Sequence, residues 1–322
     1  MARNICITSI EGQTGFLIAE LLLTDDRFQP RIDSLTGLAL DPSSPKAKEL
    51  QALGAVIAAH TPGRARDVVA TLQKTACDTL CLVPPARSDK LDIALELAEA
   101  AKKAGVANVL LISAAGCDYA ERAAQPRLRE FVDLESVVLS AKGDPESALG
   151  IRLVAGFYAE NLLLYSEQAR NEGLLPLPIG ENHKFAPIAL GDVSLVAAHV
   201  LTGKGPHGFD DRHRGQLMVL TGPMLCSGKE LAESASKALG QTMEFDNISE
   251  REAKRVLKSQ TDLDDSEKEY ILDYYSLVRE GKTNYISTTA FHDVTGQHPT
   301  EPDEFFRNYA GELRPKKKLR SS

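Results

Sequence analysis

The stretch NICITSIEGQTGFLIAELLL, residues 4–23, decides the fold that we expect for this chain. A short apolar run over residues 4–9 comes first, a turn with two glycines follows, and apolar residues then recur at helical spacing over residues 13–24. A strand, a glycine turn and a helix in this order are typical of the start of a dinucleotide-binding domain. The helix is expected to bury Phe16, Leu17, Ala19, Leu21 and Leu22.

The turn keeps the spacing G-x-x-G-x-x-G, with Ser9, Gly12 and Gly15 at the three glycine positions. These positions serve a tight turn, a close approach of the backbone to pyrophosphate, and close packing of the helix on the strand. A serine can be held in a turn conformation at a modest cost. The N-terminus of the helix offers free N–H groups to a diphosphate, so Gln13 and Thr14 join the cofactor-binding candidates. A doubly wound domain that has lost its nucleotide site is the alternative.

The rest of the first half alternates short apolar runs with helical patterns. Further strands are expected at residues 34–40, 54–60, 78–83, 108–113 and 149–156. Between the fourth and fifth strands, Leu91, Ala94, Leu95, Ala98 and Ala101 repeat at helical spacing, and Gly105 is a typical helix end. This alternation predicts an α/β fold with a doubly wound, parallel, Rossmann-type sheet.

After residue 156 the sequence becomes rich in proline and glycine. A short strand is expected at residues 184–190, and Asp192 is expected to cap a helix that runs to Leu201. We therefore expect an NAD(P)-binding domain over residues 1–156. Residues 157–314 would form a smaller mixed α/β lobe for a substrate or partner, with segments returning to the sheet. Residues 315–322 are a basic tail, either a frayed end or a nuclear address or phosphate contact.

Composition restricts the class of protein. The chain has 322 residues and a net charge of −8, which argues against strong direct binding to nucleic acid. No apolar stretch approaches the roughly 20 residues that cross a bilayer, and the first residues do not resemble a signal peptide. The chain has five cysteines, an odd number, and no histidine stands near them in the sequence. Buried thiols are therefore expected rather than a metal site. A cytoplasmic protein follows, with a nuclear location left open by the tail.

The end of the second strand would contact the ribose of the adenosine. Asp41 there could accept a hydrogen bond from a 2′-hydroxyl group, which favours NAD. Lys46, Lys48 and two serines nearby could instead hold a 2′-phosphate, which favours NADP. Asp41 is also a common turn former before proline. Both cofactors stay open at this point.

Several stretches resemble the NmrA-like family, atypical members of the short-chain dehydrogenase superfamily. They are ITSIEGQTG (7–15), CLVPPARSDKLDIALELAEAAKKAGVANVLLISAAG (81–116), GIRLVAGFYAENLL (150–163), FAPIALGDVSLVAAHVLTG (185–203) and the segment 274–306. The resemblance implies a Rossmann-like domain with a small C-terminal lobe and a bound NADP(H) or NAD(H). Some members of that family are regulators that sense the redox state of the nucleotide, and others reduce quinones, phenylpropanoids or alkaloid imines.

The resemblance also implies which residues surround the nicotinamide. The implied nicotinamide contacts follow three strands: Val83, Pro84, Pro85, Ser113, Ala114, Gly156 and Phe157. The candidate substrate contacts are Tyr158 and Asn161, which are three apart at the start of a helix and can both face the cleft, and His183, Phe185 and Pro187, in a proline- and glycine-rich loop where a substrate lid could lie. Ligands do bind at the carboxyl ends of strands in open α/β sheets. Core packing and loop solvation are the alternatives for these side chains.

Two departures from the family bear on catalysis. The reductases of the family often carry a lysine four residues before a glutamate, and matching that glutamate to Glu135 puts Phe131 at the lysine position. Tyr119 is followed four residues later by Ala123 rather than by the lysine of the superfamily's Y-x-x-x-K pair.

Tyr119 is the best remaining proton donor, although a phenol with a pKa near ~10 needs activation. One hypothesis is a reductase that delivers hydride to a quinone or imine. The other is a non-catalytic redox sensor that binds a transcription factor or another protein.

Overall fold

A seven-stranded parallel sheet is the centre of the molecule. The structure, a computed structural model, describes residues 2–139, 150–205, 209–210, 213–260, 263–283 and 288–315. Across the sheet the strands run in the order β3 (Val56–Ala59), β2 (Ile32–Ala39), β1 (Arg3–Thr8), β4 (Thr79–Leu82), β5 (Asn108–Ala114), β6 (Gly150–Ala155) and β8 (Leu217–Leu220). All six neighbouring pairs are parallel. The order reverses between β1 and β4, and such a switch point leaves a crevice at the carboxyl ends of the strands.

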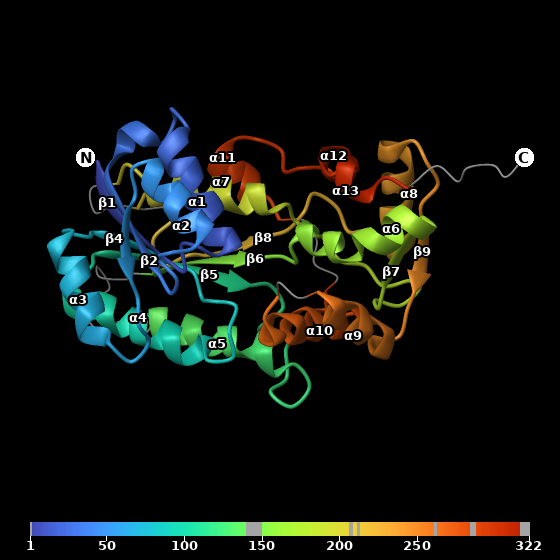
Figure 1. The fold of residues 1–322 in the computed structure, drawn as a ribbon, viewed down its shortest axis with the longest axis horizontal. Helices are drawn as coiled ribbons and strands as arrows, with labels where there is room; N and C mark the ends of the chain where they lie inside the picture. The colour runs from blue at the N-terminus through green and yellow to red at the C-terminus, as the bar shows by residue number, and fades with distance from the viewer. Residues whose placement is uncertain are drawn as a thin grey trace, which may run out of the picture.

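Helices cover both faces of this sheet, as the sequence pattern predicts. On one face lie α1 (Gln13–Thr24), α2 (Pro45–Ala52), α7 (Leu190–Leu201) and α11 (Ala290–Thr295), and on the other lie α3 (Ala65–Lys74), α4 (Lys90–Ala104) and α5 (Pro126–Leu139) (Figure 1). The helix α4 ends at Gly105 in the left-handed conformation, φ +78°. Because glycine has no Cβ, it adopts this backbone at low cost.

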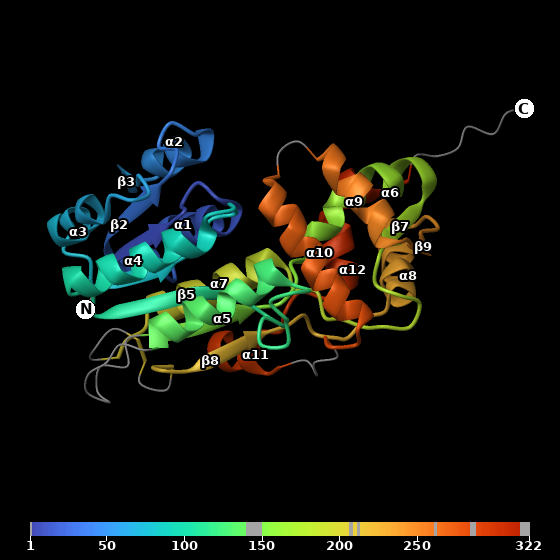
Figure 2. The ribbon, with the colours of Figure 1, turned by 90° about the horizontal axis from the view of Figure 1, so that it is seen from below.

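A smaller lobe gathers at one end of the sheet (Figure 2). Its elements are a 3-10 helix, η3 (Ala159–Tyr165), then α6 (Ser166–Glu172), β7 (Leu174–Leu177), α8 (Gly228–Leu239), β9 (Glu244–Asn247), α9 (Glu250–Ser259), α10 (Asp265–Arg279), α12 (Pro302–Asn308) and α13 (Ala310–Leu313). The strands β7 and β9 form a separate parallel pair. The sheet and this lobe together confirm the predicted α/β fold class.

The helix α10 joins the lobe to the large sheet through α5. Asp273 on α10 accepts hydrogen bonds from the main-chain N–H groups of Arg127 and Leu128, at 2.8 and 3.2 Å. The side chain of Gln125 donates to Ser276 and Glu280, at 2.7 and 2.9 Å. The two bonds to Asp273 satisfy main-chain N–H groups at the start of α5 that have no intrahelical acceptor.

Two expectations about the second half are wrong. Residues 184–190 form no strand: Phe185 and Ile188 make single bridges to different partners, Cys226 and Tyr158. Asp192 does not cap α7, which begins two residues earlier. Its carboxylate instead accepts hydrogen bonds from the main-chain N–H and the hydroxyl group of Thr300, at 2.7 and 3.0 Å.

The buried face of α1 also differs from the expectation. Ala19 and Leu22 are buried as predicted, but Gly15 and Ile18 complete that face. Phe16, Leu17 and Leu21 pack at its margin. All five cysteines are buried thiols. No helix within the described ranges is long and apolar enough to cross a membrane, and the basic tail from residue 316 onward lies outside the described residues.

Candidate nucleotide and substrate site

The first turn of the chain is held by hydroxyl groups at the switch point of the sheet. Ser9 has φ +48°, in the left-handed region that residues other than glycine rarely adopt. Its hydroxyl group donates to the main-chain oxygen of Val83, at 3.0 Å, and the hydroxyl group of Thr8 donates to the same oxygen at 2.9 Å. The N–H of Val83 in turn donates to Thr8 at 2.8 Å. The serine therefore keeps the turn and links the end of β1 to the end of β4.

The two glycines of the turn differ in how strictly space requires them. A Cβ at Gly15 would lie 2.5 Å from the main-chain oxygen of Ser9, so only glycine lets α1 approach β1 this closely. A Cβ at Gly12 would lie 3.1 Å from the same oxygen, and Gly12 has an extended backbone, φ −70°, that any residue can adopt. The strict requirement is thus at Gly15, whereas a Cβ at Gly12 would need only a small shift.

The N-terminus of α1 fits a diphosphate. No side chain caps this end, and its first turn carries no acidic residue. The first helical hydrogen bond runs from the N–H of Phe16 to the oxygen of Gly12, at 2.9 Å, so the N–H groups of Gln13, Thr14 and Gly15 have no acceptor inside the helix. These donors and the positive end of the helix dipole are the groups that hold phosphates in such turns.

A residue that the sequence pattern does not single out, Glu11, contacts the end of β2, which is the predicted ribose end of the site. One carboxylate oxygen of Glu11, Oε1, accepts hydrogen bonds from the main-chain N–H groups of Leu40 and Asp41, at 2.7 and 3.0 Å. The carboxylate of Asp41 accepts from the N–H and hydroxyl group of Ser43, at 2.9 and 2.6 Å, as a turn former does. Lys46 places its ammonium group 5.8 Å from the ring centre of Phe16.

The ends of β4 and β5 supply a largely apolar wall. Val83 and Pro85 are buried and Pro84 is half-buried. Ser113 donates to the carboxylate of Glu135 at 2.5 Å. Ala114, next to Ser113, pairs with Ala155 of β6. Glu135 also accepts from the thiol of Cys117, at 3.6 Å, and burial raises the pKa of this thiol above its ordinary value.

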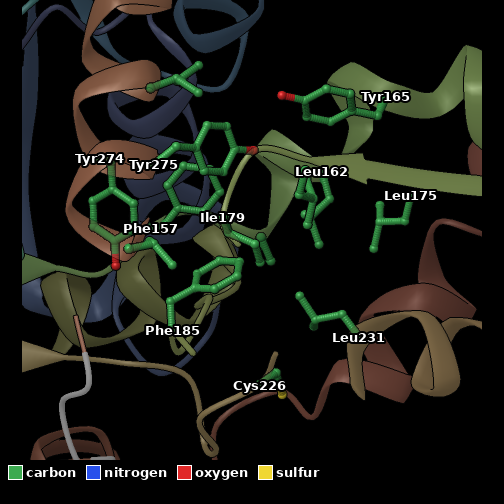
Figure 3. Packing of buried hydrophobic residues seen from close by; sticks show 14 of the residues in the cluster. Phe157, Leu162, Tyr165, Leu175, Ile179, Phe185, Cys226, Leu231, Tyr274 and Tyr275 are labelled. Carbon is green, nitrogen blue, oxygen red and sulfur yellow. The ribbon is translucent and has the colours of Figure 1, made fainter. Parts of the chain in front are cut away.

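The residues after β6 enter the core of the lobe. A Cβ at Gly156 would lie 3.0 Å from the main-chain oxygen of Leu220, so a side chain there would need a small shift of the backbone. The ring of Phe157 is fully buried; it stacks on Tyr274 with ring centres 4.9 Å apart, and meets Phe185 edge to face at 5.7 Å (Figure 3). The side chains of Phe157 and Phe185 therefore pack into this core, and a contact of either one with cofactor or substrate stays a prediction.

Tyr158 connects the lobe to the glycine turn. Its phenol oxygen accepts a long hydrogen bond from the hydroxyl group of Thr14, at 3.5 Å, although the two residues are far apart in sequence. Burial raises the pKa of Tyr158 to about 12. The phenol therefore stays protonated near neutral pH, and it can donate a hydrogen bond but cannot act as a base. Asn161, partly exposed, follows in η3, where its N–H donates to the oxygen of Tyr158 at 3.0 Å.

The predicted substrate loop is tied to the lobe. The ring of His183 lies 3.2 Å through Nδ1 from the main-chain oxygen of Ile179, and Lys184 pairs with Glu230 at 2.7 Å. Pro187 lines a small cavity beneath α12, together with Phe305 and other apolar residues. Substrate contacts of His183 and Pro187 stay predictions.

The two positions that depart from the reductase pattern lie in different surroundings. Tyr119 is 49% exposed, in the loop after β5, and its role as a proton donor stays a prediction. Phe131 lies between α4 and α10: the ammonium group of Lys90 is 4.2 Å from its ring centre, and the ring of Tyr270 is 5.9 Å away. Lys90 is buried, pairs with Glu130 at 3.2 Å, and has a pKa lowered mainly by burial.

The profile of the NmrA-like family matches residues 2–310. The chain belongs to the NmrA-like family. This NmrA-like protein is 29% identical over 220 residues to an NAD(P)H azoreductase of Xenophilus azovorans, a match that covers 68% of this chain and 71% of the azoreductase. Within the described residues, no group of three or more histidine, cysteine or carboxylate side chains is placed to hold a metal ion.

Solved structures share the fold. An NADPH-dependent quinone oxidoreductase of Escherichia coli, in complex with NADPH, has a TM-score of 0.76 and 21% identity, covering 94% of this chain and 99% of the other. NmrA, a negative transcriptional regulator in complex with NADP, has a TM-score of 0.73 and 14% identity, covering 97% of each chain. Enzymes and a regulator are thus both built on this architecture.

Proposed function

We propose that this NmrA-like protein is an NAD(P)H-dependent reductase that transfers hydride to a small, flat, electrophilic acceptor such as a quinone, an imine or an azo compound. The contact between Thr14 and Tyr158 carries the proposal. This contact places Tyr158, the residue just before η3 of the C-terminal lobe, next to the glycine turn, which fits a diphosphate. An acceptor bound at this junction would lie beside the nucleotide.

Each group of residues at this junction has a separate proposed role. The N–H groups of Gln13, Thr14 and Gly15 bind the diphosphate, and Pro84 and Pro85 form a rigid wall. When bound, the nicotinamide supplies the hydride. Tyr158 positions the acceptor and, as a protonated phenol, can donate a hydrogen bond to it. Asn161, His183 and Pro187 are further proposed substrate contacts.

Quinones and imines suit such a site because the protein need mainly position the two reactants. The Y-x-x-x-K pair of the superfamily is missing, so the reduction of an ordinary ketone lacks its usual proton source. The azoreductase similarity extends the proposed acceptors to azo compounds.

A redox sensor is the second candidate, and Phe131 favours it. At the position where reductases of the family often carry a lysine, this chain places an aromatic ring that packs against Lys90 and Tyr270. In a sensor, the nucleotide would bind without turnover and the C-terminal lobe would contact a regulatory protein. NmrA shows that this architecture serves a transcriptional regulator.

Calorimetric titration of the purified protein with NADH, NAD, NADPH and NADP, followed by turnover assays, tests the proposal. We expect a reduced nucleotide to bind and to be oxidised when a quinone, imine or azo compound is added. Tyr158→Phe should raise KM for the acceptor and leave nucleotide affinity unchanged. In Tyr119→Phe, a lower kcat with unchanged nucleotide affinity is the result expected of a proton donor. Tight binding without turnover of any acceptor would favour the sensor.

A further inference from the structure

The side chain of Glu11 reaches the carboxyl end of β2. Glu11 belongs to the glycine turn, between Ser9 and Gly12, and its Oε1 accepts hydrogen bonds from the N–H groups of Leu40 and Asp41. These two N–H groups follow the carboxyl end of β2. In doubly wound folds, this strand end is where the 2′ position of the ribose is recognised.

We propose that Glu11 makes the nucleotide site selective for a dinucleotide with a free ribose 2′-hydroxyl group, NAD(H), over the 2′-phosphorylated form, NADP(H). The inference rests on the proposed function only in that the glycine turn holds a dinucleotide. The inference adds that this cofactor is NAD(H) rather than NADP(H).

Hydrogen-bond chemistry separates the two cofactors at this point. A phosphate group brings acceptor oxygens and about −1.5 to −2 charges, so it needs donors or cations. The two main-chain donors at the end of β2 already bind Glu11, whose carboxylate would repel the phosphate. The other carboxylate oxygen, Oε2, is buried and has no hydrogen-bond partner in the part of the chain that the structure describes. A ribose 2′-hydroxyl group carries no charge, so the carboxylate does not repel it and it needs no cation at this strand end.

The cations nearby do not neutralise Glu11. In the described part of the chain, no ion pair joins Glu11 to a lysine, arginine or histidine. Lys46 lies over the ring of Phe16, and Lys48 lies close enough to Asp41 to help lower the pKa of that carboxyl group. Burial lowers the pKa of His60, which is therefore neutral near pH 7. A 2′-phosphate group at the end of β2 would therefore lie beside the carboxylate of Glu11, which would repel it.

Calorimetric titration with NADH and NADPH, and with the fragments 5′-AMP and 2′,5′-ADP, tests this selectivity without requiring turnover. We expect NADH to bind at least about tenfold more tightly than NADPH. Glu11→Gln removes the charge but keeps an oxygen for the two N–H groups. This substitution should lower the ratio of the dissociation constant of NADPH to that of NADH by about tenfold, mainly because NADPH binds more tightly. Glu20→Gln, a charge-removing change on α1 away from the turn, is the matched control and should leave the preference unchanged.

The outcomes separate this inference from the proposed function. Binding of NADPH that equals or exceeds that of NADH in the unaltered protein would overturn the selectivity and leave the reductase proposal intact. The same preference in Glu11→Gln as in the unaltered protein would show that another group selects the cofactor. If none of the nucleotides bound, both the selectivity and the proposed function would be overturned. Thermal unfolding of each variant establishes that the comparison is made between folded proteins.

Discussion

The hydroxyl group of Ser9 donates to the main-chain oxygen of Val83 over 3.0 Å, while Ser9 itself holds a left-handed backbone. Sequence spacing marks Ser9 as a departure from the glycine pattern. The structure shows how the chain tolerates it: the side chain that makes the backbone conformation costly also makes a hydrogen bond across the switch point of the sheet.

Two substitutions at Ser9 separate these contributions. Ser9→Gly loses the hydrogen bond but adopts φ +48° freely, so we expect the free energy of unfolding to stay within about 1 kcal/mol of the unaltered protein. Ser9→Val loses the bond and places a β-branched residue in the left-handed region, which should cost about 2 kcal/mol or more. Urea unfolding measures both values. Equal stability of the two variants would show that the backbone of Ser9 is not under this constraint.

Gly12→Val should abolish nucleotide binding while the protein still folds. The backbone of Gly12 suits any residue, whereas the added side chain fills the space that a pyrophosphate needs. We expect the affinity for the preferred nucleotide to fall by at least about a hundredfold, measured by calorimetry. Unchanged affinity in a folded Gly12→Val variant would disprove this placement of the nucleotide.

Gly15→Ala should instead destabilise the fold. Its Cβ would lie 2.5 Å from the main-chain oxygen of Ser9, and neither backbone segment can yield without moving α1 away from β1. Overpacking of this kind costs about 1–3 kcal/mol. Thermal unfolding therefore distinguishes Gly15→Ala from Gly12→Val, even though both should lose nucleotide binding.

The junction between α5 and α10 should make stability depend on pH. Burial raises the pKa of Asp273 to about 6 in the folded protein, above its ordinary value of 3.8. A carboxyl group with a raised folded-state pKa contributes stability at low pH, and this contribution is lost as the pH rises through about 6. Asp273→Asn keeps an oxygen for the N–H groups of Arg127 and Leu128 but does not titrate.

We therefore expect the melting temperature of Asp273→Asn, relative to that of the unaltered protein, to rise as the pH increases from about 4 to 7. Scanning calorimetry across this range gives the comparison. A difference that stays constant with pH, or that falls as the pH rises, would contradict the raised pKa.

Phe157 should be a principal stabilising residue of the C-terminal lobe. Its ring is fully buried between Tyr274, Tyr275 and Phe185. Phe157→Ala should lower the free energy of unfolding by about 3–5 kcal/mol, because removal of the ring leaves a cavity. Tyr119→Phe, at a half-exposed position, should change it by less than about 0.5 kcal/mol and serves as the control for this stability measurement.

The centre of the sheet could be predicted from the sequence because β1, β4 and β5 are buried along almost their whole length and read as apolar runs. The expected strand at residues 108–113 is observed over Asn108–Ala114, and the helix at residues 13–24 has the predicted bounds. The second half was harder to predict. Residues 184–190 are as apolar as a strand, yet they have different bridge partners on the two sides, and Pro187 lacks an N–H group.

The backbone geometry of the candidate site could be predicted from the sequence, whereas its side-chain contacts could not, and binding of a nucleotide there stays a prediction. Spacing alone identifies Gly12 and Gly15. No periodicity indicates that Glu11 extends from its turn to the N–H groups of the neighbouring strand, because that contact exists only once β1 and β2 are paired. The one signal of Glu11 in the sequence is its negative charge, which is unexpected in a turn that is predicted to hold a diphosphate.

The strand β8 adds a consequence for the biogenesis of the protein. Residues 217–220 complete the large sheet beside β6 only after η3, α6, β7 and α7 have been synthesised. Until then, the β6 edge would present unpaired N–H and C=O groups, the kind of edge that recruits other chains. Nascent chains that stop before residue 217 should therefore aggregate or require chaperones rather than accumulate as a free nucleotide-binding half.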